Sequence, residues 1–91
     1  SWYQPALYYY RDHHQHEVDV LLKKVDQYIL LEIKSSQTFH PEFLKGLNYL
    51  HSLAPEKFKH GYLVYTGVSQ TLANYKLLNV YDLHDELIQW V

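Results

Sequence analysis

The sequence predicts a single α/β domain with a mixed sheet, in which a three-strand meander is followed by a crossover helix and a parallel fourth strand. Three short runs rich in apolar and aromatic residues come first, separated by only a few polar residues. A segment with leucines at helical spacing follows, and then an apolar run bounded by two glycines. Strand, helix and strand in this order form a crossover unit, whose two strands are parallel. A chain of 91 residues has room for one domain, so the domain is expected to cover residues 1–91.

The first three runs are predicted to be antiparallel strands. They cover residues 6–11, 17–24 and 28–35. The first is rich in tyrosine, and the third is apolar almost throughout, as expected for a central strand covered on both faces. The polar segment 12–16 separates the first two strands, and a short turn around Asp26 joins the second to the third. These three strands therefore form the meander.

A helix is predicted over residues 41–53. Pro41 fits the first turn of a helix, where its missing N–H costs nothing, and Thr38 or His40 would be the cap. Apolar residues recur along this segment at helical spacing: Phe43, Leu44, Leu47, Leu50 and Leu53. The three that we expect to pack against the sheet are Phe43, Leu47 and Leu50.

The last third of the chain is predicted to add a strand, a loop and a second helix. Residues 62–66 form a short apolar strand between two glycines. Residues 69–76 are polar and predicted to be a loop, and residues 77–81 are predicted to be a short edge strand. Asp82 is the expected N-cap of the final helix. The side chains on the buried face of that helix are predicted to be Leu83, Leu87 and Trp90.

The hairpin between the second and third strands decides where three charged side chains lie. A two-residue turn that begins at Val25 places Asp19 opposite Glu32, and one that begins a residue later places Asp19 opposite Lys34. In either register the three groups cluster on one sheet face, because directly opposed residues share a face. A three-residue turn would place Asp19 opposite Ile33, on the far face, unless a bulge restored the alternation.

The neighbours of these charged groups indicate chemistry. Glu32 and Lys34 project from the same face of the third strand as Tyr28 and Leu30. A solvent-facing strand has little use for such apolar neighbours, whereas a metal-dependent phosphodiesterase needs carboxylates and an amine held rigidly beside a dry wall. The pattern therefore predicts a catalytic site formed by Glu32, Lys34 and Asp19.

Asp19 on the second strand and Glu32-x-Lys34 on the third, followed by a helix and a parallel strand, resemble the core of the PD-(D/E)XK nuclease superfamily, to which archaeal Holliday-junction resolvases belong. Across nearly the whole chain, the sequence also resembles the C-terminal domain of unknown function of a large family of prokaryotic AAA-type ATPases. The motifs that carry this second resemblance are Tyr-Tyr-Arg-Asp, Glu-Val-Asp, Glu-Ile-Lys-Ser-Ser, Phe-Leu-Lys-Gly-Leu and Gly-Tyr-Leu-Val-Tyr. The resemblance implies a restriction endonuclease-like core, here without its first helix.

The resemblance assigns a role to each residue of the predicted site. Asp19 and Glu32 would bind magnesium or manganese, with the backbone carbonyl of Ile33 as an extra ligand, and Lys34 would orient the attacking water. The implied reaction is metal-dependent hydrolysis of DNA phosphodiester bonds, so DNA is an expected partner. The resemblance also implies an ATPase domain upstream in cis, and ATP would bind only on that domain.

Two other functions fit the same residues. A non-catalytic module would dock DNA or another protein for the ATPase, and its charged cluster would then be a structural remnant of a nuclease. A dimerisation module would form a homodimer through the aromatic first strand or the segment near Leu77. Glu17 is either a carboxylate that supports Asp19 or a solvated strand start, and Lys57 and Lys59 are either phosphate contacts or part of a solvated loop.

Composition excludes several classes of protein. The chain has no cysteine, so disulfides and thiolate metal sites are excluded. The net charge of −2 argues against binding nucleic acid by bulk electrostatics. No apolar run approaches the roughly 20 residues that span a bilayer, which predicts a cytoplasmic protein without a membrane partner. Because the chain has no methionine, we expect it to be a fragment of a longer protein, and the resemblance implies that it is the C-terminal part of an ATPase.

Overall fold

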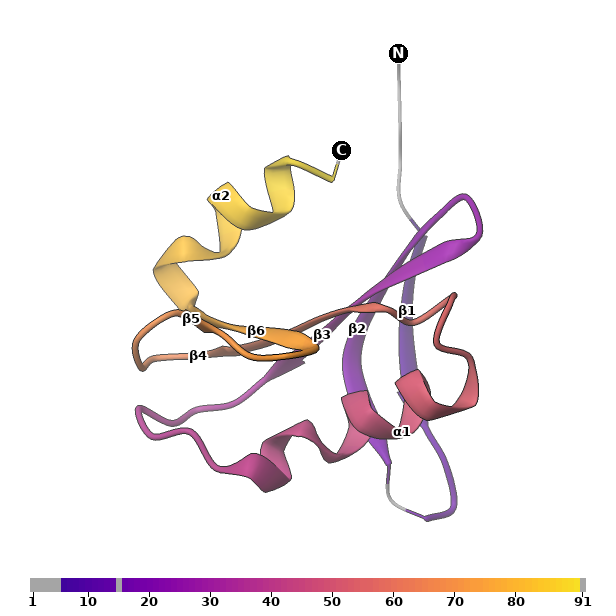
Figure 1. The fold of residues 1–91 in the computed structure, drawn as a ribbon, viewed down its shortest axis with the longest axis horizontal. Coiled ribbons are helices and arrows are strands. Elements are labelled where there is room, and N and C mark those ends of the chain that lie inside the picture. Colours follow the sequence, from indigo (N-terminus) through magenta and orange to yellow (C-terminus); the bar gives the residue numbers. More distant parts are fainter. Residues whose placement is uncertain (1–5, 15, 91) are drawn as a thin grey trace.

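A mixed sheet lies between two helices, α1 on one face and α2 on the other (Figure 1). The computed structural model describes residues 6–14 and 16–90. Within these residues the sheet has six strands in the order β1-β2-β3-β4-β6-β5. The strands are β1 (Ala6–Arg11), β2 (Glu17–Lys24), β3 (Gln27–Ile33), β4 (His60–Tyr65), β5 (Gln70–Thr71) and β6 (Tyr75–Asn79). The helices are the 3-10 helix η1 (Pro41–Leu44), α1 (Lys45–Leu53), the 3-10 helix η2 (Val80–Asp82) and α2 (Leu83–Ile88).

The strand pairing confirms the predicted fold class. β1, β2 and β3 form an antiparallel meander, and β3 pairs with β4 in parallel after the crossover through α1. The hairpin between β2 and β3 turns at Val25 and Asp26, with Lys24 paired to Gln27. Val25 adopts a φ of 57°, a left-handed conformation that a tight turn imposes. The two-residue turn that begins at Val25 is therefore the correct one of the two registers expected.

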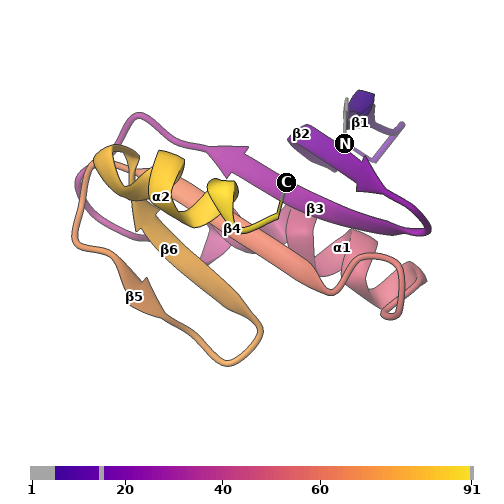
Figure 2. The same cartoon turned by 90° about the horizontal axis from the view of Figure 1, so that it is seen from above.

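Each face of the sheet has its own core. Figure 2 shows α2 crossing one of these faces, with α1 behind the sheet. Side chains alternate along β3, so Leu30 packs toward α1 while Ile29 and Leu31 pack toward α2. The buried residues on the α1 side include Val18, Leu30, Leu47, Leu50 and Tyr75. Those on the α2 side are Ile29, Leu31, Tyr62, Val64 and Leu78, with Leu83, Leu87 and Trp90 packed against them. The predicted buried faces of both helices are thereby confirmed.

Gly46 allows α1 to approach β2 closely. A Cβ atom at this position would lie 1.9 Å from the backbone oxygen of Glu17. No side chain fits there without moving the backbone of the helix or the strand, so glycine is required by the packing. This close approach brings the helix over the end of β2 at which Asp19 lies.

The predicted helix start is wrong in detail. Pro41 begins a 3-10 helix that runs to Leu44, and the α-helix starts only at Lys45. His40 occupies the cap position of the 3-10 helix, but its side chain accepts no capping hydrogen bond. The predicted end of the third strand is also corrected, because β3 stops at Ile33.

The predicted loop over residues 69–76 and the edge strand over residues 77–81 are wrong. β5 and the start of β6 lie within the predicted loop, and β6 is an inner strand between β4 and β5. The apolar residues of β6 are buried because the strand pairs in parallel with β4. Asp82 occupies the N-cap position of α2, as predicted, but its side chain makes no capping hydrogen bond and accepts one from the Ser69 hydroxyl, while the Asn79 side chain caps η2. None of the helices in the part of the chain described here has the length and apolar character needed to cross a membrane.

Candidate functional site

Asp19 and Glu32 meet where the pairing of β2 with β3 ends. The last paired residues of the ladder are Val20 and Leu31, so the next step of the register brings Asp19 opposite Glu32. The backbone N–H of Ile33 donates to Asp19 Oδ2 at 2.9 Å, and the Asp19 side chain thus bridges the two strands. The Asp19 and Glu32 carboxyl groups are themselves in hydrogen-bond contact. The predicted juxtaposition of the two acids is confirmed.

A β-bulge on β2 changes the face of the sheet on which Val18, the neighbour of Asp19, packs. β1 pairs Tyr8 with Leu21 but Tyr10 with Val18, so two residues of β2 stand opposite Tyr9. A bulge of this kind interrupts the alternation of side chains along the bulged strand. Val18 therefore packs in the core on the α1 side, next to the residue that contacts Glu32.

Glu32 is a buried acid with an unusual proton affinity. Its exposed fraction is 5%, and it is the only buried charged residue in the part of the chain that the structure describes. Burial raises the pKa of Glu32 to about 8, together with the hydrogen bond that its protonated carboxyl donates to Asp19 and the negative charge of Asp19. The charge of Lys34 and the backbone N–H of Asp19 act in the opposite direction. The pair therefore holds a proton at neutral pH.

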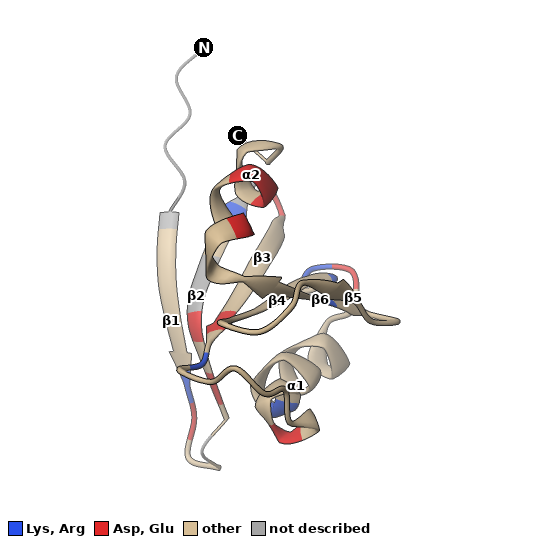
Figure 3. Ribbon diagram, turned by 90° about the vertical axis from the view of Figure 1, so that its left-hand side faces the viewer, with Lys and Arg blue, Asp and Glu red and all other residues tan. Residues whose placement is uncertain are grey.

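Lys34 joins the site from the end of β3. Its backbone N–H donates to the Val64 oxygen at 2.9 Å, which continues the parallel pairing for one more residue. Its Nζ lies 5.5 Å from the centre of the Phe43 ring, and its positive charge acts to lower the pKa of Glu32. Figure 3 shows how the acidic segments of β2 and β3 lie next to each other in the sheet. The sequence pattern predicted Phe43 only as a core residue; its contact with the ammonium depends on the 3-10 turn that carries it.

Glu17 has a different environment from Asp19. Its Oε1 accepts hydrogen bonds from the Tyr9 hydroxyl at 2.9 Å and from Arg11 Nε at 2.8 Å. Both bonds lower the pKa of Glu17, and the bond from Tyr9 has the larger effect. The charge of Asp19 has only a minor influence on Glu17, so this carboxylate belongs to the pairing of β1 with β2 and lies apart from the acidic pair.

Lys57 and Lys59 lie at the other end of the sheet. The Lys57 backbone oxygen accepts a hydrogen bond from the Tyr28 N–H, and Lys59 directly precedes β4. Tyr28 and Glu32 are four residues apart on one strand, a separation of about 13 Å. The structure therefore does not bring these lysines to the acidic pair.

The residues that the structure describes contain no group of three or more His, Asp and Glu side chains arranged to hold a metal ion. The acidic pair supplies two carboxylates and, next to them, the backbone of Ile33. The site is thus a pair of acids with a neighbouring ammonium, one acid of which is buried and protonated at neutral pH.

Fold and site together define a mixed α/β domain with a buried acidic pair at the end of two neighbouring strands. The model of one protein family, the Domain of unknown function (DUF4143), matches residues 1–83. The chain belongs to this family. No curated protein matches the sequence.

Proposed function

We propose that this domain is a nuclease-like module of the PD-(D/E)XK type, which hydrolyses DNA phosphodiester bonds with the help of a divalent metal ion. The observation that carries the proposal is the contact between Asp19 and Glu32, with Glu32 buried and Lys34 beside it. Two ionised carboxylates in a site with low exposure would destabilise each other, so without a cation the pair keeps a proton at neutral pH. Such a pair is accounted for if its role is to bind a cation.

The donor set fits magnesium or manganese. Mg²⁺ usually keeps several water ligands and is bound through one or two carboxylates, so a pair of acids is sufficient. Asp19 and Glu32 would hold the ion, and the carbonyl of Ile33 is the candidate third ligand. When bound, the metal supplies a more acidic water and neutralises charge on the phosphate. The proton that Glu32 carries at neutral pH would leave as the cation binds.

The chain positions its own groups for this chemistry. The N–H of Ile33 fixes Asp19 Oδ2, so this carboxylate needs little reorganisation when a ligand arrives. Lys34 stands next to the pair and is restrained by Phe43, an arrangement suited to orienting a water or stabilising developing negative charge. Both groups lie on elements of the sheet or directly after them, where the backbone is rigid.

The second candidate function is a non-catalytic docking module of an AAA-type ATPase. Two observations favour it. The site offers only two carboxylates to a metal ion, and a chain with a net charge of −2 binds DNA weakly. In this alternative the acidic pair stabilises the end of the β2–β3 hairpin. The attachment to an ATPase, and a cytoplasmic location, are part of the proposal in both cases.

A plasmid-nicking assay separates the two functions. The 91-residue chain would be incubated with supercoiled DNA and Mg²⁺ or Mn²⁺, beside Lys34→Ala and Lys57→Ala variants. Lys57 is an exposed lysine remote from the acidic pair, so its variant is the matched control for a lost positive charge. Slow nicking that persists in Lys57→Ala and disappears in Lys34→Ala supports the nuclease. Nicking that is absent, or equal in both variants, supports the docking module.

A further inference from the structure

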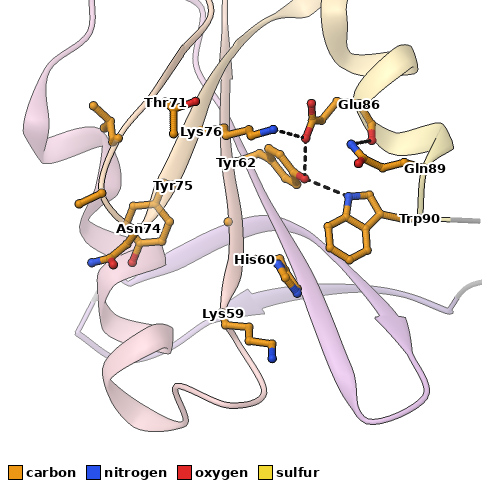
Figure 4. A pocket seen from close by; sticks show the side chains of 13 residues that line it. Lys59, His60, Tyr62, Thr71, Asn74, Tyr75, Lys76, Glu86, Gln89 and Trp90 are labelled. Atoms are coloured by element: carbon orange, nitrogen blue, oxygen red, sulfur yellow. Dashed lines mark hydrogen bonds and ion pairs between the residues drawn. The ribbon is translucent and has the colours of Figure 1, made fainter.

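A trough of about 280 Å³ lies where the end of α2 meets the beginnings of β4 and β6. Figure 4 shows the side chains that line it, among them His60, Tyr62 and Trp90. The trough is at the start of β4, whereas Glu32 and Lys34 lie at the end of β3. It is therefore a separate feature from the acidic pair.

Aromatic rings form one wall of the trough. The rings of His60 and Trp90 lie with their centres 4.4 Å apart and their planes inclined by 55°. Burial, and then the neighbouring charge of Lys59, lower the pKa of His60, so its imidazole is neutral at pH 7. A neutral imidazole and an indole each present an aromatic face of the kind on which a heterocyclic ring stacks, and here the two faces are inclined to each other.

A hydrogen-bond network holds this wall in place. Trp90 Nε1 donates to the Tyr62 hydroxyl at 2.9 Å, and that hydroxyl donates to Glu86 Oε2 at 2.9 Å. Lys76 Nζ lies 3.0 Å from the same oxygen, so the charge of Glu86 is balanced inside the network. Dashed lines in Figure 4 mark these three contacts and the hydrogen bond from the Gln89 side chain to the backbone oxygen of Glu86. The aromatic wall is thus fixed to the sheet before any ligand arrives.

Lys59 supplies positive charge at the rim of the trough. Its side chain is exposed, and within the described part of the chain it forms no ion pair. Asn74, on the other side of the trough, adds an exposed amide. An ammonium next to aromatic faces suits a ligand with an anionic group attached to a flat ring.

We propose that this trough binds an unpaired nucleotide, with the heterocyclic base against His60 and Trp90 and a phosphate on Lys59. The volume is close to the lower limit for a ligand pocket, which fits one nucleotide and not a larger cofactor. The nucleotide is either a free monophosphate or the end of a single strand, since both present the same base and phosphate. The site does not depend on the proposed nuclease chemistry, because it shares no residue with the acidic pair.

Intrinsic fluorescence tests this proposal. The chain has two tryptophans, so a Trp2→Phe background leaves Trp90 as the reporter. Thymidine 5′-monophosphate, thymidine, inorganic phosphate and a six-residue oligothymidylate would be titrated separately. We expect saturable quenching by the monophosphate, the oligonucleotide or both, weaker quenching by thymidine and none by phosphate. Quenching by the monophosphate identifies a free nucleotide as sufficient, and quenching by the oligonucleotide alone identifies a strand end.

Two variants in the Trp2→Phe background locate the phosphate contact. Lys59→Ala should weaken binding and lower the slope of log affinity against log salt for the oligonucleotide by about 0.7. Lys57→Ala, two residues away and outside the trough, should leave both unchanged. Asp19→Ala should also bind normally, which separates this site from the acidic pair. Absence of saturable quenching at millimolar ligand, or equal loss in Lys57→Ala and Lys59→Ala, would overturn the proposal.

Discussion

The carboxylate of Asp19 on β2 accepts a hydrogen bond from the backbone N–H of Ile33, at the end of β3, at a distance of 2.9 Å. This bond lies just beyond the last backbone pair of the two strands, Val20 with Leu31. A side chain therefore replaces the backbone as the link between the strands. The consequence is that Asp19 is held against Glu32, and the proton affinity of Glu32 depends on it.

The first prediction concerns this dependence. In an NMR titration of the side-chain carboxyl carbons, Glu32 should titrate near pH 8 in the wild-type chain. Asp19→Asn removes the negative charge but keeps an oxygen that can accept the Ile33 N–H. The Glu32 midpoint should then fall, yet stay above the usual value of 4.5, because burial is the largest cause of the shift. A wild-type midpoint near 4.5 would contradict the burial of Glu32.

The second prediction is a pH dependence of stability. The pKa of Glu32 is about 8 in the folded chain and near 4.5 in the unfolded chain, so the folded state binds more protons between these values. Its contribution to the free energy of unfolding is fully present below pH 4.5 and is lost as the pH rises through 8. When the pH is raised from 5 to 8.5, the urea concentration at the unfolding midpoint should therefore decrease more for the wild type than for Glu32→Gln. Equal falls in the two proteins would show that Glu32 is not the group responsible.

The third prediction tests the packing of α1 on the sheet. Leu47 is fully buried in the core with Val18 and Leu30, so Leu47→Ala should reduce the free energy of unfolding by about 2–5 kcal/mol. Leu53 on the same helix is 57% exposed, and Leu53→Ala is the matched control with a much smaller effect. Chemical denaturation measures both. Equal losses would mean that the helix presents a different face to the sheet.

The fourth prediction concerns the contact of Gly46 with β2. In an exposed helix, replacing glycine by alanine stabilises the helix by about 0.5–1 kcal/mol. Here the new Cβ would lie 1.9 Å from the Glu17 oxygen, so Gly46→Ala should destabilise the chain by about 1–3 kcal/mol. Asn48→Ala, at an exposed position two residues along, reports the intrinsic effect of alanine in this helix. A stabilised Gly46→Ala variant would exclude the close approach of helix and strand.

Local patterns were sufficient to predict the meander, the two-residue turn and the crossover, because alternation and turn length are properties of short segments. The position of Asp19 against Glu32 follows from the turn at Val25 and Asp26 alone. The bulge opposite Tyr9 was not predictable, because it depends on how β1 pairs with β2 across the first turn.

Tertiary pairing accounts for the errors at the C-terminal end. The polar segment that precedes β6 gives no signal of a strand, and β6 is buried because it lies between β4 and β5. Tertiary contacts also explain why the Asp82 side chain makes no capping hydrogen bond. Its carboxylate instead accepts a hydrogen bond from the hydroxyl of Ser69, 13 residues earlier in the chain. The distance of Lys57 and Lys59 from the acidic pair was not predictable either, because it depends on which ends of the parallel strands β3 and β4 lie together.

Paramagnetic broadening by Mn²⁺ tests most directly whether Asp19 and Glu32 form a cation site. In amide spectra of the wild-type chain at pH 7.5, substoichiometric Mn²⁺ should broaden the signals of Asp19, Glu32, Ile33 and Lys34 before those of the acids on α2, and excess Mg²⁺ should restore them. Asp19→Ala should abolish this selective broadening, while Glu17→Gln, which changes the nearby carboxylate paired with Arg11, should retain it. Broadening that starts at Asp85 and Glu86, or that is the same in the wild type and Asp19→Ala, would contradict the account.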